Sequence, residues 1–234
     1  MKRILLLTAI AVSALTACHK AETTITFNIT DLPDGATIMI CKNHTNIDQN
    51  YTTTITSDGT FCYTYTCDTV TESALYYVRV SDSVRSIRLI FIKENCNTTV
   101  TGSGIFAENW TIESDNPRQQ FYNKWNDATK DLRIEYNKIR AEMANPSHEV
   151  IERINEAQSK LYDAEWAFIE SAPIDECWLE AFADATDIIN RKGTDCPEYP
   201  KMTEIYKRLS EADKATPAGK QITKNLFGGE KVTE

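Results

Sequence analysis

The spacing of apolar residues changes once along this chain, near residue 114, and that change constrains the fold more than any other feature. Before it, short runs rich in Thr, Val, Ile and Tyr are separated by turn residues, a pattern typical of β-strands. After it, apolar residues recur every three or four positions, as in amphipathic helices. The sequence therefore predicts an α+β protein, with strands in residues 23–113 and helices in residues 114–227.

The strand-rich segment alternates apolar and polar side chains. In "TFCYTYT" (60–66), Phe61, Tyr63 and Tyr65 share one face of a strand, and Cys62 lies on the other. About seven or eight such short runs predict an N-terminal antiparallel β-sandwich. The turn sequences "SDG" and "SDS" each separate two of these runs and predict β-hairpins.

Two long helices are predicted to follow. Asn116 and Pro117 have the residue types preferred just before and at the first position of a helix. Apolar residues then recur at helical spacing through 117–143 and again through 148–171, with "NPS" (145–147) between them. Because the connection is short, we expect the two helices to form a long antiparallel helical hairpin.

Shorter helices complete the predicted helical domain. One is expected near residues 175–190, another begins at Pro200, and a last one begins at Pro217. Residues 228–234 form a polar tail.

The amino terminus has the features of an export signal. Lys2 and Arg3 precede an apolar segment, 4–12, which is shorter than the about 20 residues that a spanning helix needs. "LTAC", ending at Cys18, resembles the lipobox of bacterial lipoproteins. The resemblance implies a signal peptide in residues 1–17, acylation of the Cys18 thiol and an anchor linker in residues 18–22. The expected location is the cell envelope, on a bacterial membrane.

Composition agrees with an anchored, exported protein. Removal of residues 1–17 leaves 23 basic and 34 acidic side chains, a formal charge of −11. With no basic patch, nucleic acid is not an expected partner. The expected partners are the lipid bilayer, through acylated Cys18, and an unknown envelope protein.

Six cysteines remain besides Cys18, and an even number in an exported chain predicts disulfides. Cys177 and Cys196 are the only two in the helical half, so they are the candidate pair. A helix unbroken from Cys177 to Lys192 would span about 22 Å, and the chain from Lys192 returns at most about 14 Å. Either the helix ends near Ile188 and the sulfurs are bonded, or it reaches Lys192 and both thiols are free.

Two tripeptides, "DTV" and "DSV", resemble a bacterial O-glycosylation signal of the form Asp-Ser/Thr-aliphatic. They make Thr69 and Ser83 candidate glycosylation sites. Both residues lie in expected turns, where a glycan can be accommodated.

No catalytic residue, metal site or cofactor is expected. His19, His44 and His148 each lack a second His or Cys two to four residues further along the chain. The Ser and Thr residues lack a nucleophile motif. The acidic residues of the helices are predicted to lie on solvated faces.

Three segments carry a resemblance to a known family, the domain of unknown function 4369. They are "FNITDLPDGATIMICKN", "ITSDGTFCYTY" and "IRLIFIKENCNTTVTG", and "TPAGKQI" (216–222) is similar to the end of the family's helical spacer. The resemblance implies an exported β-domain. In relatives a thioredoxin-like domain with W-C-x-x-C follows the spacer, and this chain ends at Glu234, where that domain would begin.

Two functions are compatible with these features. The first is a non-enzymatic cell-envelope lipoprotein that acts as a binding or scaffold module. The alternative is an accessory component of a thiol–disulfide, thioredoxin-like system without a redox centre of its own. The chain contains no C-x-x-C, which favours the first.

The lipid anchor gives a direct prediction. Substitution Cys18→Ser removes the thiol that accepts the diacylglycerol, so metabolic labelling with a radioactive fatty acid should be lost. Labelling that persists in this variant would contradict the assignment.

Overall fold

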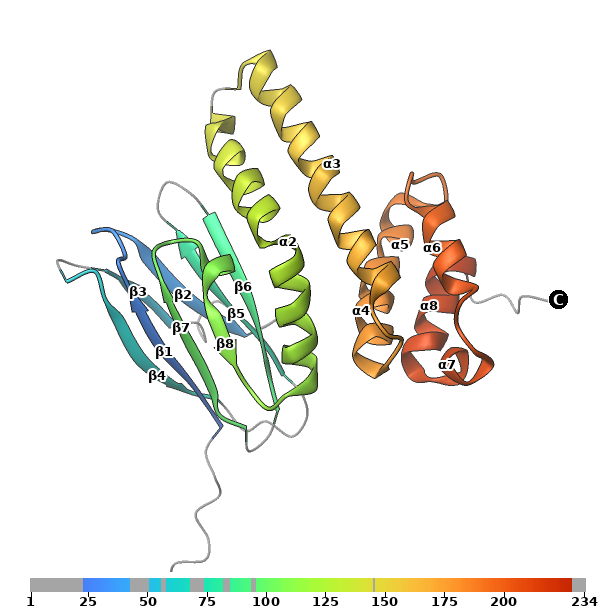
Figure 1. The fold of residues 1–234 in the computed structure, drawn as a ribbon, viewed down its shortest axis with the longest axis horizontal. Helices are drawn as coiled ribbons and strands as arrows, with labels where there is room; N and C mark the ends of the chain where they lie inside the picture. The colour runs from blue at the N-terminus through green and yellow to red at the C-terminus, as the bar shows by residue number, and fades with distance from the viewer. Residues whose placement is uncertain are drawn as a thin grey trace, which may run out of the picture.

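The structure is a computed structural model that describes residues 23–42, 51–55, 58–67, 74–81, 85–93, 96–144 and 146–228. All of its described strands precede the long helices (Figure 1), which confirms a mixed fold with strands first and helices second. The strands are β1 (Thr24–Thr30), β2 (Thr37–Lys42), β3 (Tyr51–Thr54), β4 (Phe61–Thr66), β5 (Ala74–Ser81), β6 (Arg85–Ile92), β7 (Thr98–Ser103) and β8 (Thr111–Glu113). A short 3₁₀ turn, η2 (Ala107–Asn109), lies between β7 and β8.

The strands form two four-stranded sheets, in the orders β4-β1-β7-β8 and β3-β2-β5-β6. The expectation of purely antiparallel strands is wrong at one position, because β1 runs parallel to β7. Parallel neighbours require a long connection, and here the whole second sheet lies between the two strands in sequence.

One predicted hairpin is confirmed and one is wrong. Strands β5 and β6, which flank "SDS", pair antiparallel along their whole length. Strands β3 and β4, which flank "SDG", belong to different sheets, since β3 pairs with β2 and β4 with β1. Gly59 does adopt a positive φ of 62°. Gly59 therefore takes the backbone conformation that its residue type predicts, but the strands on its two sides belong to different sheets.

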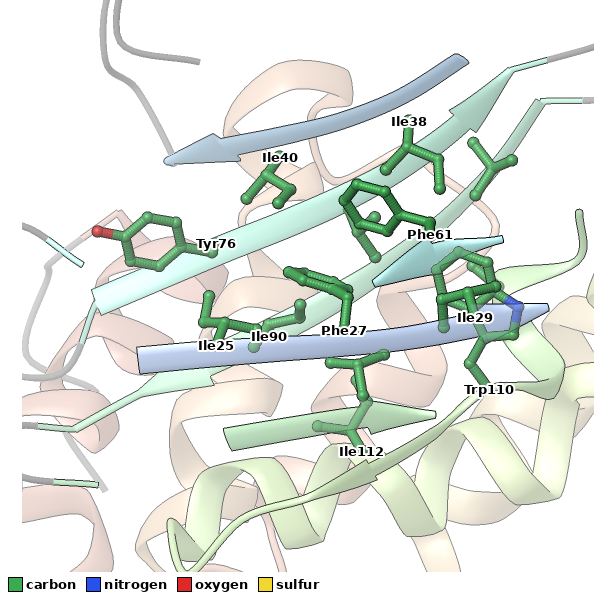
Figure 2. Packing of buried hydrophobic residues seen from close by; sticks show 14 of the residues in the cluster. Ile25, Phe27, Ile29, Ile38, Ile40, Phe61, Tyr76, Ile90, Trp110 and Ile112 are labelled. Carbon is green, nitrogen blue, oxygen red and sulfur yellow. The ribbon is translucent and has the colours of Figure 1, made fainter. Parts of the chain in front are cut away.

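Both sheets contribute side chains to one buried cluster (Figure 2). The first sheet provides Phe27 of β1 and Phe61 of β4, whose rings lie 5.5 Å apart between centroids. The second sheet provides Ile38 of β2 and Ile90 of β6, both fully buried. The alternation predicted for β4 is confirmed, with Phe61 buried and Cys62 exposed.

The helices are α2 (Pro117–Ala141), α3 (His148–Ser171), α4 (Glu176–Thr186), α5 (Ile188–Lys192), α6 (Tyr199–Tyr206), α7 (Glu211–Ala215) and α8 (Pro217–Phe227), with a 3₁₀ turn, η3 (Glu142–Ala144), after α2. Several of them follow a residue whose side chain accepts a hydrogen bond from a first-turn backbone N–H, which has no partner within the helix. The Asn116 carboxamide accepts from the Arg118 N–H at 3.0 Å, as predicted for this helix start. Ser147, Asp175, Ser210 and Thr216 act in the same way at α3, α4, α7 and α8.

Helix α2 covers an edge strand of the second sheet. Strand β6 ends that sheet, so the backbone groups of Phe91 on its outer side lack a neighbouring strand. The Gln119 side chain accepts a hydrogen bond from the Phe91 N–H at 2.8 Å, and the Asn116 side chain donates to the Phe91 carbonyl at 3.0 Å. Two amides of the helix thus take the place of the missing strand.

The same helix contacts the edge of the first sheet, where β8 lies last. The Asn123 carboxamide donates to the Ile112 carbonyl at 2.7 Å. One turn further on, Asn126 donates to the Glu108 carbonyl, also at 2.7 Å. Helix α2 is therefore hydrogen-bonded to both sheets, and its other side packs against α3 (Figure 1).

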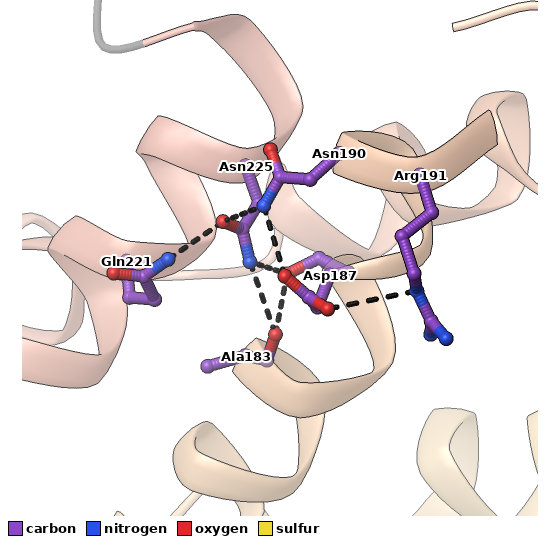
Figure 3. A network of polar contacts seen from close by, with 7 residues as sticks. Ala183, Asp187, Asn190, Arg191, Gln221 and Asn225 are labelled. Atoms are coloured by element: carbon purple, nitrogen blue, oxygen red, sulfur yellow. Dashed lines mark hydrogen bonds and ion pairs between the residues drawn. The ribbon is translucent and has the colours of Figure 1, made fainter. Parts of the chain in front are cut away.

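The helix expected over residues 175–190 is interrupted. It ends as α4 at Thr186 and resumes as α5 after Asp187. At this interruption the buried Asn225 side chain of α8 donates to the Ala183 carbonyl at 3.2 Å and to the Thr186 hydroxyl at 3.0 Å (Figure 3). Asn190 donates to the Asn225 carboxamide oxygen at 2.9 Å, which links α5 to the same network.

Cys177 lies near the start of α4, partly buried, and Cys196 is buried after α5. All cysteines of the described residues are free thiols in the structure. The helical segment continues past Ile188 to Lys192, with the break at Asp187. A disulfide between the two remains a prediction, to be decided by peptide mapping under non-reducing conditions.

The contact between α2 and β6 gives a stability prediction. In Gln119→Met the side chain keeps its length but no longer accepts from the Phe91 N–H, which is left buried without a partner. We expect the free energy of unfolding to fall by about 1–3 kcal/mol in urea denaturation. Gln120→Met is the matched control on the exposed side of the helix, with an expected change within about 0.5 kcal/mol. Equal effects of the two substitutions would contradict the role of Gln119.

Candidate binding site

Among the cavities that lie along the described helices, two share the lining residue Glu165 of α3. We call them together the hairpin groove. The junction cavity, of about 350 Å³, lies where β6, η2, α2 and α3 meet. Its polar lining residues are Glu108, Arg133, Tyr136, Asn137, Arg140 and Glu165.

The aromatic cavity, of about 240 Å³, is bordered by α2, α3 and the α4–α5 segment. The lining residues that matter for its chemistry are Trp125, Tyr162, Glu165, Trp166, Asp184 and Arg191. It is smaller than the about 300 Å³ at which sites for drug-sized ligands begin, so by itself it suits a single small ring or side chain.

Glu108 of η2 provides a buried carboxylate to the junction cavity. Its side chain is only 3% exposed. One oxygen accepts from the Asn137 carboxamide at 2.9 Å, and the other accepts from the Ser86 hydroxyl. Ser86 in turn accepts from the Ala107 N–H at 2.8 Å. Each carboxylate oxygen is thus hydrogen-bonded, which offsets the cost of burying the group.

Arg133 and Glu165 form an ion pair across the two long helices, with 2.7 Å between Nη2 and Oε1. Arg133 also donates through Nε to the Thr129 hydroxyl at 3.1 Å, which orients the guanidinium. Burial raises the pKa of Glu165 above its ordinary value, while the neighbouring Arg133 charge acts in the opposite direction. Arg133 therefore offsets part of the cost of keeping this partly buried carboxylate charged.

Arg88 of β6 lies beneath the groove, between the sheet and α2, and is 6% exposed. It donates to the Asn123 carboxamide oxygen at 3.0 Å. Burial lowers the pKa of Arg88 to about 10, with the charges of Asp127 and Glu108 acting in the opposite direction. At neutral pH it is a buried positive charge close to the Glu108 carboxylate.

Aromatic rings determine the shape of the second cavity. Tyr162 meets Trp166 edge-on, with 5.9 Å between ring centroids. Trp125 stacks with Tyr122 at 5.5 Å and with Phe168 at 5.9 Å. The predicted apolar stripe of α2 thus packs largely against α3, as expected for core residues, although Met143 near its end is exposed.

Charged side chains border the aromatic rings, and each has an opposite charge nearby. Asp184 of α4 lies 3.6 Å from Arg118, and Arg191 of α5 lies 3.7 Å from Asp187 (Figure 3). Burial raises the pKa of Asp184, and Arg118 acts against that rise. The aromatic cavity therefore offers donors and acceptors without a large net charge.

Of the site residues predicted from sequence, the two that the structure describes, Cys177 and Cys196, do not line this groove. Cys18, Thr69 and Ser83 lie outside the described residues. Cys177 and Cys196 belong to the core of the carboxyl-terminal helices. The sequence does not distinguish Glu108, Arg133 and Glu165 from solvated surface charges. Only the packing of α2, α3 and η2 against one another shows that these three side chains converge.

Neither known family models nor curated proteins match this chain. The resemblance to the domain of unknown function 4369 remains a prediction. In the part of the chain that the structure describes, no helix combines the length and apolar character needed to cross a membrane. Nor, among the same residues, do three acidic, His or Cys side chains gather closely enough to hold a metal ion.

The ion pair of the groove gives a pH-dependent prediction. In Arg133→Met the Glu165 carboxylate loses its charged partner, so the free energy of unfolding at pH 7 should fall by about 1–3 kcal/mol. As the pH falls through the raised pKa of Glu165, the carboxyl takes up a proton and no longer needs a cation. The loss should therefore be smaller near pH 4 than at pH 7, as measured by urea denaturation at both.

Arg153→Met is the control for this prediction, because Arg153 pairs with Glu142 at 3.0 Å in an exposed position. Its expected cost is at most about 1 kcal/mol. A loss for Arg133→Met that is independent of pH would mean that the ion pair contributes little.

Proposed function

We propose that this chain is a non-enzymatic cell-envelope lipoprotein, anchored to a bacterial membrane through acylated Cys18, and that the hairpin groove is its binding site. The observation that carries the proposal is the convergence of six polar side chains from η2, α2 and α3 on one cavity of about 350 Å³. A concave site with a few oriented polar groups is the usual form of a small-ligand site. Its occupant is a small molecule or a segment of an envelope protein partner.

The hydrogen bonding of the groove favours binding over catalysis. General acid–base catalysis needs a side chain that is free to exchange a proton with the substrate. Both oxygens of Glu108 already accept hydrogen bonds, and Glu165 is paired with Arg133. These contacts orient the carboxylates as fixed acceptors.

We also propose that the two sheets constitute a β-sandwich and that α2 and α3 constitute an antiparallel helical hairpin. The shared buried cluster of the sheets supports the first. The order of contacts supports the second, because Phe121 near the start of α2 meets Phe168 near the end of α3, and Glu142 just after α2 meets Arg153 near the start of α3. Such a frame would provide a rigid support for the groove.

The binding function is tested with variants of α3. Leu161 lines the junction cavity, so Leu161→Arg places a long charged side chain in the groove. Ile151 is exposed on the same helix, and Ile151→Arg is the matched control. Small molecules from an envelope extract should be retained by the wild-type mature protein and by Ile151→Arg, and lost from Leu161→Arg.

Mass spectrometry of the retained molecule before and after prolonged incubation distinguishes a binding protein from an enzyme. We expect the molecule to be recovered unchanged. Conversion to a product by the wild-type protein would contradict a non-enzymatic role, and equal retention by all three proteins would place binding elsewhere.

An accessory role in a thiol–disulfide system is the second candidate, and the exposed Cys62 thiol on β4 is the observation that favours it. An exposed thiol can form a mixed disulfide with a separate reductase. Because the chain has no C-x-x-C, we expect the purified protein to show no insulin reduction with dithiothreitol above the uncatalysed rate. Turnover that is abolished by Cys62→Ser would contradict this expectation and would give the chain a redox centre of its own.

A further inference from the structure

We propose that the hairpin groove binds a neutral glycan, with one sugar ring in the aromatic cavity. This inference rests on the proposed binding function and specifies its ligand class. Three features of the aromatic cavity support it, namely its paired charges, its hydrogen-bonding groups and its apolar surface.

The first feature is the pairing of the charges that line the aromatic cavity. Recognition of an ionic ligand needs a charge that the protein leaves without a partner, because a charge that is already paired gains little from a second one. Glu165 is 2.7 Å from Arg133, Asp184 is 3.6 Å from Arg118, and Arg191 is 3.7 Å from Asp187. The charges that line the aromatic cavity are thus balanced within the protein, which favours a neutral ligand.

The second feature is the mixture of hydrogen-bond donors and acceptors in the cavity. Carboxylates only accept and guanidinium groups only donate. The aromatic cavity contains both kinds, in Glu165 and Asp184 on one hand and Arg191 on the other. A hydroxyl group donates one hydrogen bond and accepts two, so it can satisfy either kind of side chain. A polyhydroxylated ligand therefore matches this mixed lining.

The third feature is the apolar surface that aromatic rings give the cavity. Tyr162 and Trp166 present aromatic carbon to the cavity beside these polar groups. Tyr162 is partly exposed, and its edge-on contact with Trp166 fixes the direction of the ring. A sugar ring has C–H groups on its faces and hydroxyls at its edge, so it can stack on an aromatic ring while its hydroxyls reach the bordering charges.

The volume of the aromatic cavity limits how much of the ligand it encloses. About 240 Å³ is sufficient for one sugar ring. A disaccharide is therefore expected to place one ring in the aromatic cavity and the other outside it.

The test uses the mature protein and six probes of three kinds. The neutral disaccharides are maltose, cellobiose and N,N′-diacetylchitobiose; the charged sugars are glucosamine and glucuronate; the neutral peptide is N-acetyl-trialanine amide. Binding is measured by saturation-transfer NMR and by tryptophan fluorescence. We expect at least one neutral disaccharide to bind, and to bind more tightly than either charged sugar.

Variants locate the binding. Tyr162→Leu removes the stacking ring and should weaken disaccharide binding about tenfold. Arg191→Gln, at the exposed border, alters one donor and should weaken it about two- to fivefold, which keeps the test available if the first variant does not fold. Tyr206→Leu is the matched control, because Tyr206 packs on Phe227 away from the groove.

The outcomes separate the two proposals. Peptide binding that depends on Tyr162, without binding of any disaccharide, would refute the glycan and leave the binding function in place. Failure of every probe, together with no molecule retained by the wild-type protein from the envelope extract, would refute both. Tighter binding of a charged sugar, or disaccharide binding that neither Tyr162→Leu nor Arg191→Gln affects, would also refute the glycan site.

Discussion

The row of amide side chains on α2 is the contact on which the rest of the molecule depends. Asn116, Gln119, Asn123 and Asn126 lie on one face of the helix and bond to the backbone of β6, β8 and η2. An uncovered edge strand exposes N–H and C=O groups that can pair with another chain. By covering two such edges, α2 both protects the sheets and acquires a fixed orientation.

That orientation determines where the groove forms. The face of α2 that does not contact the sheets packs against α3. Arg118, in the first turn of α2, connects this helix to the carboxyl-terminal helices. Its guanidinium lies 4.6 Å from the ring centroid of Phe91 and 3.0 Å from the Glu180 carboxylate. The sheets, the two long helices and α4 are thus linked through α2, and the cavities lie at the places where these parts meet without filling the space.

Local sequence signals predicted the elements that depend on local physics. Asn116 before Pro117 correctly marks the start of α2, because the cap forms within one helical turn. The alternation in β4 gives the right faces, because a strand has a period of two. The "SDG" hairpin failed because Gly59 sets only the direction of the turn, while partner choice depends on β1, which is distant in sequence. The break at Asp187 was not predicted either, and Asn225 of α8, which bonds to the Ala183 carbonyl there, is distant in sequence.

By itself, the sequence determined the order of strands and helices and most helix starts, since both follow from spacing and capping residues within a few turns. Only the tertiary structure decided the parallel pairing of β1 with β7 and the convergence of Glu108, Arg133 and Glu165. The Asn and Gln residues of α2 had helical spacing that was visible in the sequence, but their partners are backbone groups, which carry no residue-specific signal. A charged side chain on a helix becomes part of a site only when another element lies opposite it. Packing between segments that are distant in sequence determines which element lies there.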